Sequence, residues 1–90
     1  MNRAERIRSA IESAIEPDSL EVTDESHLHA GHAGAQPGGE THYEVTVVSS
    51  RFSGQSRVAR QRSVYALLGN EFSSGLHALS VRALTPEEVS

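Results

Sequence analysis

Apolar residues at helical spacing mark the first segment of the chain. Five of them recur at three- and four-residue steps: Ala4, Ile7, Ile11, Ala14 and Ile15. This spacing predicts an amphipathic helix over residues 3–15. Pro17 ends the helix, because the residue before a proline avoids helical geometry. Apolar and polar residues then alternate over residues 20–23, which predicts a short strand.

Two later segments also alternate apolar and polar residues. Residues 41–50 form the clearest predicted strand, and His42 lies on its polar side, where we expect a structural role. Residues 77–84 predict a third strand that begins at His77. Both strands are therefore expected to have one side directed to a core.

A second helix is predicted between these two strands. It extends from about residue 56 to residue 68, and three of its side chains are expected to face inward: Val58, Tyr65 and Leu68. Gly69 ends this helix, and residues 70–74 fit a single helical turn. After the last strand, Thr85 and Pro86 have the pattern of a helix start, with a threonine cap followed by proline at the first position.

The order of these elements predicts a single α+β domain over residues 1–90. Three strands with helices packed on one face form a sandwich of this class. The first two strands form a hairpin and are expected to be antiparallel. The connection from the second strand to the third contains a helix, so that pair can be parallel and the sheet mixed.

The connection between the first two strands has the most informative composition. Residues 25–40 hold four of the seven glycines together with Pro37, which is typical of a mobile or functional loop. His27, His29 and His32 lie within it, and imidazole is a common ligand for zinc, copper and iron. The chain has no cysteine, so it cannot hold a metal or an iron–sulfur cluster through thiolates of its own.

All eight basic residues are arginines, and four of them lie in one segment without acids. Residues 51–70 carry four arginines and no acid, although the net charge of the whole chain is −4. Such a cluster can contact nucleic acid, an acidic partner or an anionic ligand such as glutathione, or it can be the solvated face of a helix. The acidic balance of the whole chain disfavours a dedicated nucleic-acid-binding domain.

Several function classes lack support in the sequence. The first residues are charged and amphipathic, unlike a signal peptide or a membrane span, so a cytoplasmic protein without a membrane partner is predicted. No serine–histidine–acid set and no phosphate-binding glycine loop is recognisable, since Gly38 and Gly39 lack the lysine that such loops need. The histidines also lack a carboxylate at a convincing ligand or general-base spacing. We therefore expect a protein that is not an enzyme.

Several motifs together resemble those of the BolA-like proteins. They are Leu20-Glu21-Val22-Thr23-Asp24-Glu25-Ser26, Glu40-Thr41-His42-Tyr43, Val47-Val48-Ser49-Ser50-Arg51-Phe52-Ser53-Gly54, Arg60-Gln61-Arg62-Ser63-Val64-Tyr65 and Leu76-His77-Ala78-Leu79. They occur in collinear order over nearly the whole chain. The resemblance implies a type II KH-like αββααβ(α) fold, which agrees with the element order above.

The resemblance also implies a function. BolA-like proteins pair with monothiol glutaredoxins and share a [2Fe-2S] cluster, to which the glutaredoxin contributes its cysteine and a bound glutathione. Carried over by position, the ligand at the last strand is His77 and the loop ligand is His29, with His32 as the alternative. The cluster would take part in iron–sulfur trafficking or iron regulation and is not expected in the isolated chain, which would be a monomer or a weak homodimer.

The resemblance leaves DNA as a second partner. A transcriptional regulator of this fold would contact DNA through the arginine-rich helix face, with Arg57, Arg60 and Arg62 as the candidate residues. The same three arginines are candidates for contacts with a protein partner or an anion. KH modules hold the nucleic-acid backbone with a GXXG loop, which this chain lacks. Family members usually have histidine where this chain has Gln61, so no role that needs that histidine carries over.

Overall fold

The computed structural model describes residues 2–25 and 41–89. Its helices and strands are α1 (Arg3–Ile15), β1 (Ser19–Asp24), β2 (His42–Val48), α2 (Arg57–Leu67), α3 (Gly69–Ser73), β3 (Ala78–Leu84) and α4 (Pro86–Val89), with a 3-10 turn at Ser50–Phe52. Each predicted element is present with bounds within two residues of the prediction. His77 precedes β3 instead of starting it.

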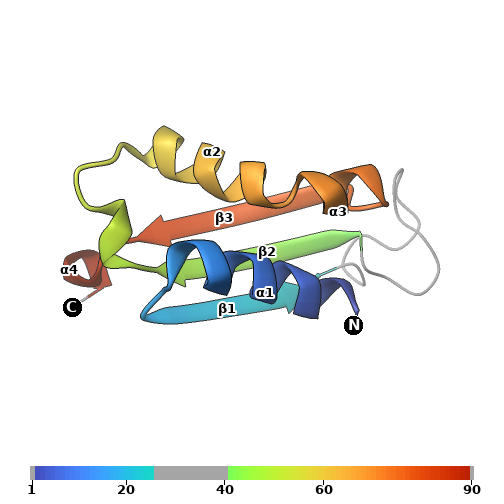
Figure 1. The fold of residues 1–90 in the computed structure, drawn as a ribbon, viewed down its shortest axis with the longest axis horizontal. Helices are drawn as coiled ribbons and strands as arrows, with labels where there is room; N and C mark the ends of the chain where they lie inside the picture. Colours follow the sequence, from blue (N-terminus) through green and yellow to red (C-terminus); the bar gives the residue numbers. More distant parts are fainter. Residues whose placement is uncertain (1, 26–40, 90) are drawn as a thin grey trace.

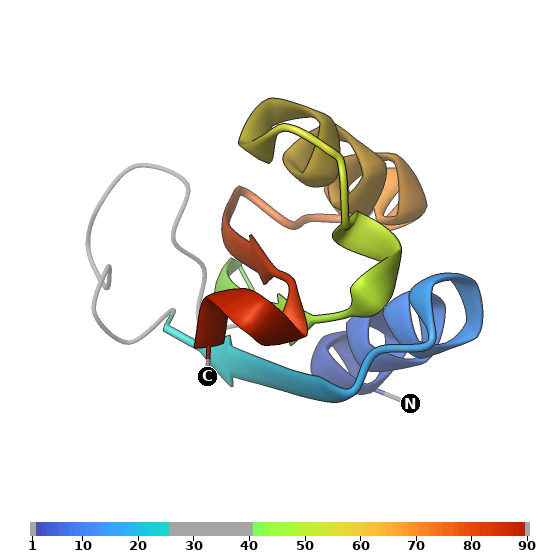
Figure 2. The same cartoon turned by 90° about the vertical axis from the view of Figure 1, so that its left-hand side faces the viewer.

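The sheet is mixed, as the connections predict. β2 is the central strand, antiparallel to β1 and parallel to β3. The helices α1 and α2 lie side by side on one face of this sheet (Figures 1 and 2). The parallel pairing aligns the first residues of β2 and β3, with His42 opposite Ala78. The two segments that lead into these strands therefore meet at the same end of the sheet.

Helix α1 has a defined cap at each end. The Asn2 side chain accepts a hydrogen bond from the Glu5 backbone N–H at 2.9 Å, which satisfies a donor that the first turn leaves without a helical partner. Glu16 adopts a left-handed conformation with φ 51° at the C-terminal end, directly before Pro17. Between the caps, the buried stripe recurs every four residues: Arg3, Ile7, Ile11 and Ile15.

Helix α2 buries a different stripe from the predicted one. Its buried residues are Arg60 and Val64, followed one turn later by buried Leu68. Val58 is 56% exposed, so the prediction that it faces inward is wrong. Tyr65 is 37% exposed, and its hydroxyl donates to the Leu79 carbonyl at 2.6 Å from the rim of the core. The four-residue spacing is regular, but its first member is an arginine, and the apolar pattern alone misses it.

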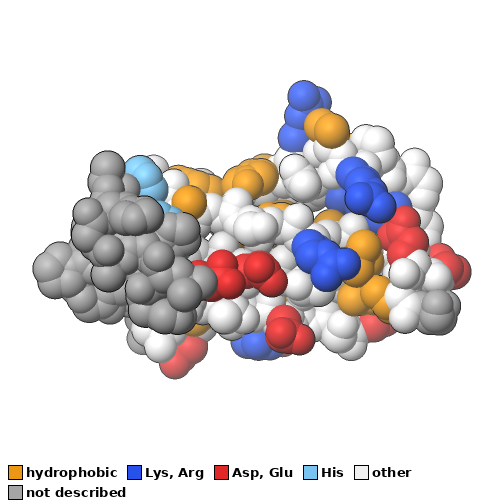
Figure 3. Space-filling model, turned by 180° about the vertical axis from the view of Figure 1, so that it is seen from behind, with side chains coloured by type: hydrophobic (Ala, Val, Ile, Leu, Met, Phe, Trp, Pro, Cys, Tyr) orange, Lys and Arg blue, Asp and Glu red, His pale blue; other side chains and the backbone are white. Residues whose placement is uncertain are grey.

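The core lies between the helices and the inner face of the sheet. The central strand contributes Tyr43, Val45 and Val47, each at most 3% exposed. The outer face of the sheet carries polar and charged side chains, among them Glu21, Glu44 and Arg82, and Figure 3 views the molecule from this side. Among the described helices, none is long and apolar enough to cross a bilayer.

Candidate functional site

His77 lies at the surface, at a point where its backbone is anchored. Its side chain is exposed, and its backbone N–H donates to the Thr41 carbonyl at 2.8 Å. The next residue, Ala78, donates to the same carbonyl at 3.1 Å. The segment entering β3 is thus attached to the segment entering β2, and the imidazole of His77 projects from a rigid base.

The turn before His77 is anchored on the other side by α3. The Leu76 backbone N–H donates to the Glu71 carbonyl at 2.9 Å, and its side chain is buried in the core. Gly75 precedes it with φ 130°, a conformation that residues with a Cβ rarely adopt. The backbone therefore reaches His77 through a turn that is held at both ends.

An ion-pair cluster with buried Arg3 and Glu71 fastens α3 to the first turn of α1. Arg3 Nη1 lies 2.9 Å from Glu71 Oε1, and Arg6 Nε lies 3.0 Å from Glu71 Oε2. Arg3 also donates to the Ser74 hydroxyl at 3.0 Å and to the Ser74 carbonyl at 3.2 Å. The hydrogen bond from Arg6, together with the attraction of both guanidiniums, holds the pKa of Glu71 below its usual value although burial opposes this. The cluster thereby braces the turn that positions His77.

His42 lies directly beside His77. It is the first residue of β2, only 6% exposed, and its ring centre is 5.3 Å from that of His77 with a tilt of 54° between the ring planes. The hydroxyl of Thr41 is 2.8 Å from His42 Nδ1. Sequence analysis gave His42 only a structural role and did not connect it with His77. The expected parallel pairing of the two strands could have indicated this contact, because it brings the first residues of both strands together.

The two described residues that flank segment 26–40 also lie at this end of the sheet. The Glu25 backbone N–H donates to the His42 carbonyl at 2.7 Å, and Thr41 contacts both histidines as described above. The predicted loop ligand His29, its alternative His32 and most of the predicted loop lie outside the described residues.

A hollow in the surface adjoins His42. Its volume is about 230 Å³, and it is lined by Glu25, His42, Tyr43, Ala78, Leu79 and Ser80. Within residues 2–25 and 41–89, no three histidine, cysteine or acidic side chains are grouped closely enough to hold a metal ion. The described residues thus provide a pair of adjacent imidazoles, of which that of His42 belongs to a residue lining the hollow.

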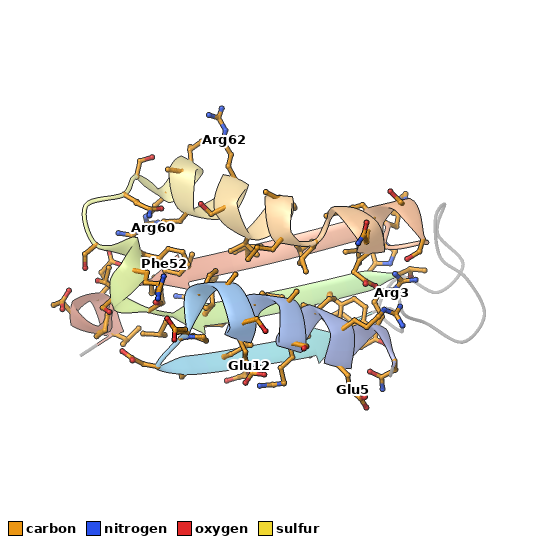
Figure 4. The ribbon with its side chains drawn as sticks, in the orientation of Figure 1. Arg3, Glu5, Glu12, Phe52, Arg60 and Arg62 are labelled. Carbon is orange, nitrogen blue, oxygen red and sulfur yellow. The ribbon has the colours of Figure 1, made fainter. Side chains whose placement is uncertain are left out.

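The three predicted contact arginines differ in their surroundings. Arg57 and Arg62 are exposed, and Figure 4 shows Arg62 pointing away from the sheet. Arg60 is 6% exposed and points toward the sheet beside Phe52. Its guanidinium donates to the carbonyls of Gln55 and Ala83, each at 3.0 Å, and to Glu88 Oε1 at 2.6 Å. The structure therefore gives Arg60 an internal structural role in place of the surface contact that the sequence suggested.

Arg57 belongs to a small groove between α2 and β3. The groove has a volume of about 120 Å³ and is lined by Arg57, Gln61, Val81, Arg82, Ala83 and Leu84. The side chains of Arg57 and Gln61 come from α2, and a guanidinium together with an amide has the chemistry to contact an anion. Arg82 of β3 also lines the groove, although its side chain belongs to the outer face of the sheet, and it was not among the residues predicted from sequence because it lies beyond the arginine-rich segment.

Comparison with known proteins agrees with this architecture. A family model described as BolA-like protein matches residues 11–88. SufE-like protein 1 of Arabidopsis thaliana is 49% identical over 98% of this chain and 25% of its own length, and BOLA1 of the same plant is 46% identical over 97% of this chain and 56% of its own length. The solved BolA domain of Arabidopsis SufE1 superposes with a TM-score of 0.87, at 48% identity, covering 98% of this chain and 96% of that one. The chain thus spans a quarter to just over half of these two full-length relatives.

The names of these relatives contradict the predicted cytoplasmic location. SufE-like protein 1 is named chloroplastic/mitochondrial, and BOLA1 is named chloroplastic. The prediction rested on the lack of an apolar signal peptide or membrane span in the first residues. That property does not distinguish the cytosol from the interior of an organelle, so the prediction was wrong in its reasoning as well as its result.

Proposed function

The chain belongs to the BolA-like protein family, and we propose that it is a non-enzymatic partner of a monothiol glutaredoxin, with which it shares a [2Fe-2S] cluster. The observation that carries this proposal is the position of His77. Its imidazole is exposed at the surface, while its backbone is held by hydrogen bonds to the segment that enters β2. A ligand to a centre shared between two proteins needs both properties, because it must be accessible and its geometry must be defined.

The donor atoms of this chain fit half of such a centre. With no cysteine in the chain, imidazole nitrogens are its best ligands for iron, and the thiolates would come from the glutaredoxin and its bound glutathione. When bound, a cluster with two imidazoles in place of two thiolates has a raised reduction potential, as in Rieske centres. This chain would hold one iron through His77 and a second histidine, and the exposed surface around His77 would receive the partner.

The second histidine in this proposal is His29, with His32 as the alternative. Both flanking residues of segment 26–40 lie beside the His42–His77 pair. His29 follows Glu25 by four residues, a chain length that spans at most about 14 Å. This short chain length from the end of the sheet supports the assignment of the second ligand to the segment between β1 and β2.

The test is a titration of this protein into a glutathione-loaded glutaredoxin that carries its cluster, under anaerobic conditions. We expect a heterodimer whose visible absorption and circular dichroism differ from those of the glutaredoxin alone. His77→Ala should abolish the spectral change while the fold is retained, because its side chain is exposed. An identical spectral change with His77→Ala would remove His77 from the ligands.

Single loop variants separate the candidates for the second ligand. His29→Ala should reproduce the effect of His77→Ala, and His32→Ala should leave the spectrum as in the wild type. The opposite result would assign the ligand to His32. Glu12→Gln is a suitable control for the protein surface, because Glu12 is exposed on α1 and is not among the predicted contact residues.

DNA binding is a second candidate function, supported by the groove between α2 and β3. Arg57 provides an exposed guanidinium from α2, and Arg82 is exposed on the neighbouring strand β3, whereas Arg60 is buried and contributes none. Contacts to phosphates should make the affinity for a short duplex fall steeply with salt. Weakening of such binding by Arg57→Ala, without an effect on the cluster spectrum, would support this function.

A further inference from the structure

The outer edge of β3 has no neighbouring strand within residues 2–25 and 41–89 (Figure 1). β3 pairs with β2 along its other edge only. A strand at the edge of a sheet presents backbone N–H and C=O groups to which another strand can be added. We propose that this edge binds a short, extended, acidic segment of a partner protein by strand addition. The proposal goes beyond the shared cluster and rests on neither the glutaredoxin nor the histidines.

The ladder between β2 and β3 shows which backbone groups face the open edge. The Leu84 carbonyl accepts the backbone N–H of Ser49, the residue directly after β2, at 2.9 Å. Leu84 is therefore turned toward β2. In a parallel ladder, alternate residues of a strand hydrogen-bond to the same neighbour. It follows that Leu79, Val81 and Ala83 direct their backbone N–H and C=O groups away from β2.

Side chains of α2 already occupy two of these three carbonyls. The Tyr65 hydroxyl donates to the Leu79 carbonyl at 2.6 Å, and Arg60 Nη1 donates to the Ala83 carbonyl at 3.0 Å. Val81 lies midway between them, and within the described part of the chain no hydrogen bond reaches its outward N–H or C=O. The open edge thus has three N–H donors and one free carbonyl, which favours a ligand rich in acceptors.

The groove between α2 and β3 places a positive charge beside this position. Val81 and Ala83 line the groove, together with Arg57 and Gln61 of α2. Arg57, Gln61 and Tyr65 recur every four residues, so they form one stripe of α2 alongside β3. Arg57 is exposed, and it takes part in none of the ion pairs among the described residues. Its guanidinium is therefore available to a carboxylate of the added segment.

The charge and the donors of this edge decide between possible occupants. Residues 51–70 carry four arginines and no acid, and Arg82 is exposed on β3 itself. A second copy of the chain would bring like charges together, which disfavours that pairing. A nucleic-acid phosphate supplies acceptors but no donor for the Val81 carbonyl. An extended acidic peptide supplies carbonyls, N–H groups and a carboxylate together, so it fits best.

NMR of the backbone amides in the full chain tests the proposal. The probe is a short acetylated and amidated peptide of alternating valine and glutamate. Its addition should shift the amide signals of Leu79, Val81 and Ala83 saturably and slow the exchange of these amides with deuterated water. The amides of Ser80 and Arg82 point toward β2, so they should change less.

Two changes to the peptide separate the contribution of its backbone from that of its charge. A peptide with glutamine in place of glutamate should bind about fivefold more weakly, because it has no carboxylate for the guanidinium. A peptide with methylated backbone nitrogens keeps its charge but cannot donate to the Val81 carbonyl. It should cause no saturable shift of the three outward amides.

A matched pair of protein variants tests the position of the charge. Arg57→Gln should weaken binding of the glutamate peptide about fivefold and leave the circular dichroism unchanged, because Arg57 is exposed. Arg8→Gln removes the same charge at the opposite edge of the sheet, where exposed Arg8 donates to the Leu20 carbonyl of β1. This second variant should bind the peptide as the wild type does.

Four results would overturn the proposal. The first is the absence of a saturable shift of the outward amides with peptide up to about 5 mM, which would leave the arginines and the side-chain caps as protection of the edge. The second is equal binding of the methylated peptide, which would show an anion contact without strand pairing. The third is tighter binding of a short DNA duplex at the same amides. The fourth is a shift of these amides when the protein alone is diluted, which would assign the edge to a second copy. No glutaredoxin is present in these measurements, so their failure and the failure of the proposed function are separate results.

Discussion

Gly75 illustrates how a single residue controls the position of the candidate ligand. It lies two residues before His77 and has φ 130°, which favours glycine over any residue with a Cβ. A Cβ at this position would also lie 3.0 Å from Arg3 Nη2, within the cluster that fastens α1 to α3. Conformation and space therefore both require glycine here, although the sequence pattern indicates only a turn.

We expect Gly75→Ala to destabilise the protein by about 1–3 kcal/mol, because alanine adds backbone strain and crowds the Arg3 guanidinium. Urea unfolding followed by circular dichroism measures this change. Gly69→Ala is the matched control, since no atom lies within 4 Å of an added Cβ there and its φ is not in the left-handed range. Its effect should stay within about 1 kcal/mol. Equal stabilities of the two variants would contradict the role given to Gly75.

The two histidines in the described structure differ in how far sequence could predict them. His77 was identified by its place in a motif, and the structure finds its side chain exposed and its backbone anchored. His42 was assigned to the polar face of a strand, where a solvated or merely structural residue is the usual result. Its burial against His77 depends on the pairing of two strands that are distant in the sequence.

At the level of the elements, Arg60 joins three of them. It comes from α2, donates to the Ala83 carbonyl at the end of β3, and binds Glu88 of α4. Glu88 in turn accepts the Thr85 backbone N–H at 2.7 Å, which is one half of a capping box at the start of the four-residue helix α4. A helix this short depends on such contacts, because its own hydrogen bonds cannot stabilise it.

Replacing Arg60 by methionine tests this connection. Arg60→Met keeps the aliphatic stem but leaves the Gln55 and Ala83 carbonyls without the guanidinium, so we expect a loss of about 1–3 kcal/mol in the free energy of unfolding. Arg57→Met, one turn earlier and exposed, should change it by less than about 0.5 kcal/mol. Chemical denaturation of both variants provides the comparison. A larger loss in the free energy of unfolding for Arg57→Met than for Arg60→Met would contradict the structural role given to the buried Arg60.

The prediction of the buried face of α2 was wrong because it did not include Arg60. The helix turns the stripe Arg60, Val64 and Leu68 toward the core, and its first member is charged. A search for apolar periodicity selects Val58 and Tyr65 instead, which lie toward the surface. A buried arginine is favourable here only because its guanidinium finds hydrogen-bond acceptors on β3, on α4 and in the turn before α2. These acceptors lie outside the helix, so the apolar pattern of α2 does not reveal them.

Across the whole molecule, two carboxylates tie together segments that are far apart in the sequence. Glu71 joins α3 to α1, and Glu88 joins α4 to α2. The hydrogen bond from Arg60, followed by that from the Thr85 backbone, lowers the pKa of Glu88 to about 2. The pKa of Glu71 is also lowered, chiefly by the hydrogen bond from Arg6. Both groups therefore favour the folded state when they are ionised.

This predicts the direction of acid unfolding. A carboxylate with a lower pKa in the folded state stabilises it fully above its unfolded value, here 4.5, and the contribution is lost as the pH falls through the folded pKa. Stability should therefore decline from about pH 5 towards pH 2. Glu71→Gln should be less stable than the wild type at pH 7, and the difference should shrink over that range.

Thermal unfolding at a series of pH values measures this convergence. Glu12→Gln controls for the change in net charge. Glu12 is on α1, the helix whose arginines pair with Glu71, but its side chain is exposed. A gap between wild type and Glu71→Gln that stays constant from pH 7 to pH 2 would contradict an ionised Glu71 as the source of the stability.

The sequence by itself determined the element order and the mixed sheet. The spacing of apolar residues and the residues that end each element are local properties of the sequence. A helix in the connection between two strands permits their parallel pairing. The lack of cysteine likewise limits the best metal donors to imidazole, whatever the fold. Which residues meet was decided by the tertiary structure, because register and side-chain acceptors arise between distant segments. The contact of His42 with His77 and the burial of Arg60 both belong to this second kind.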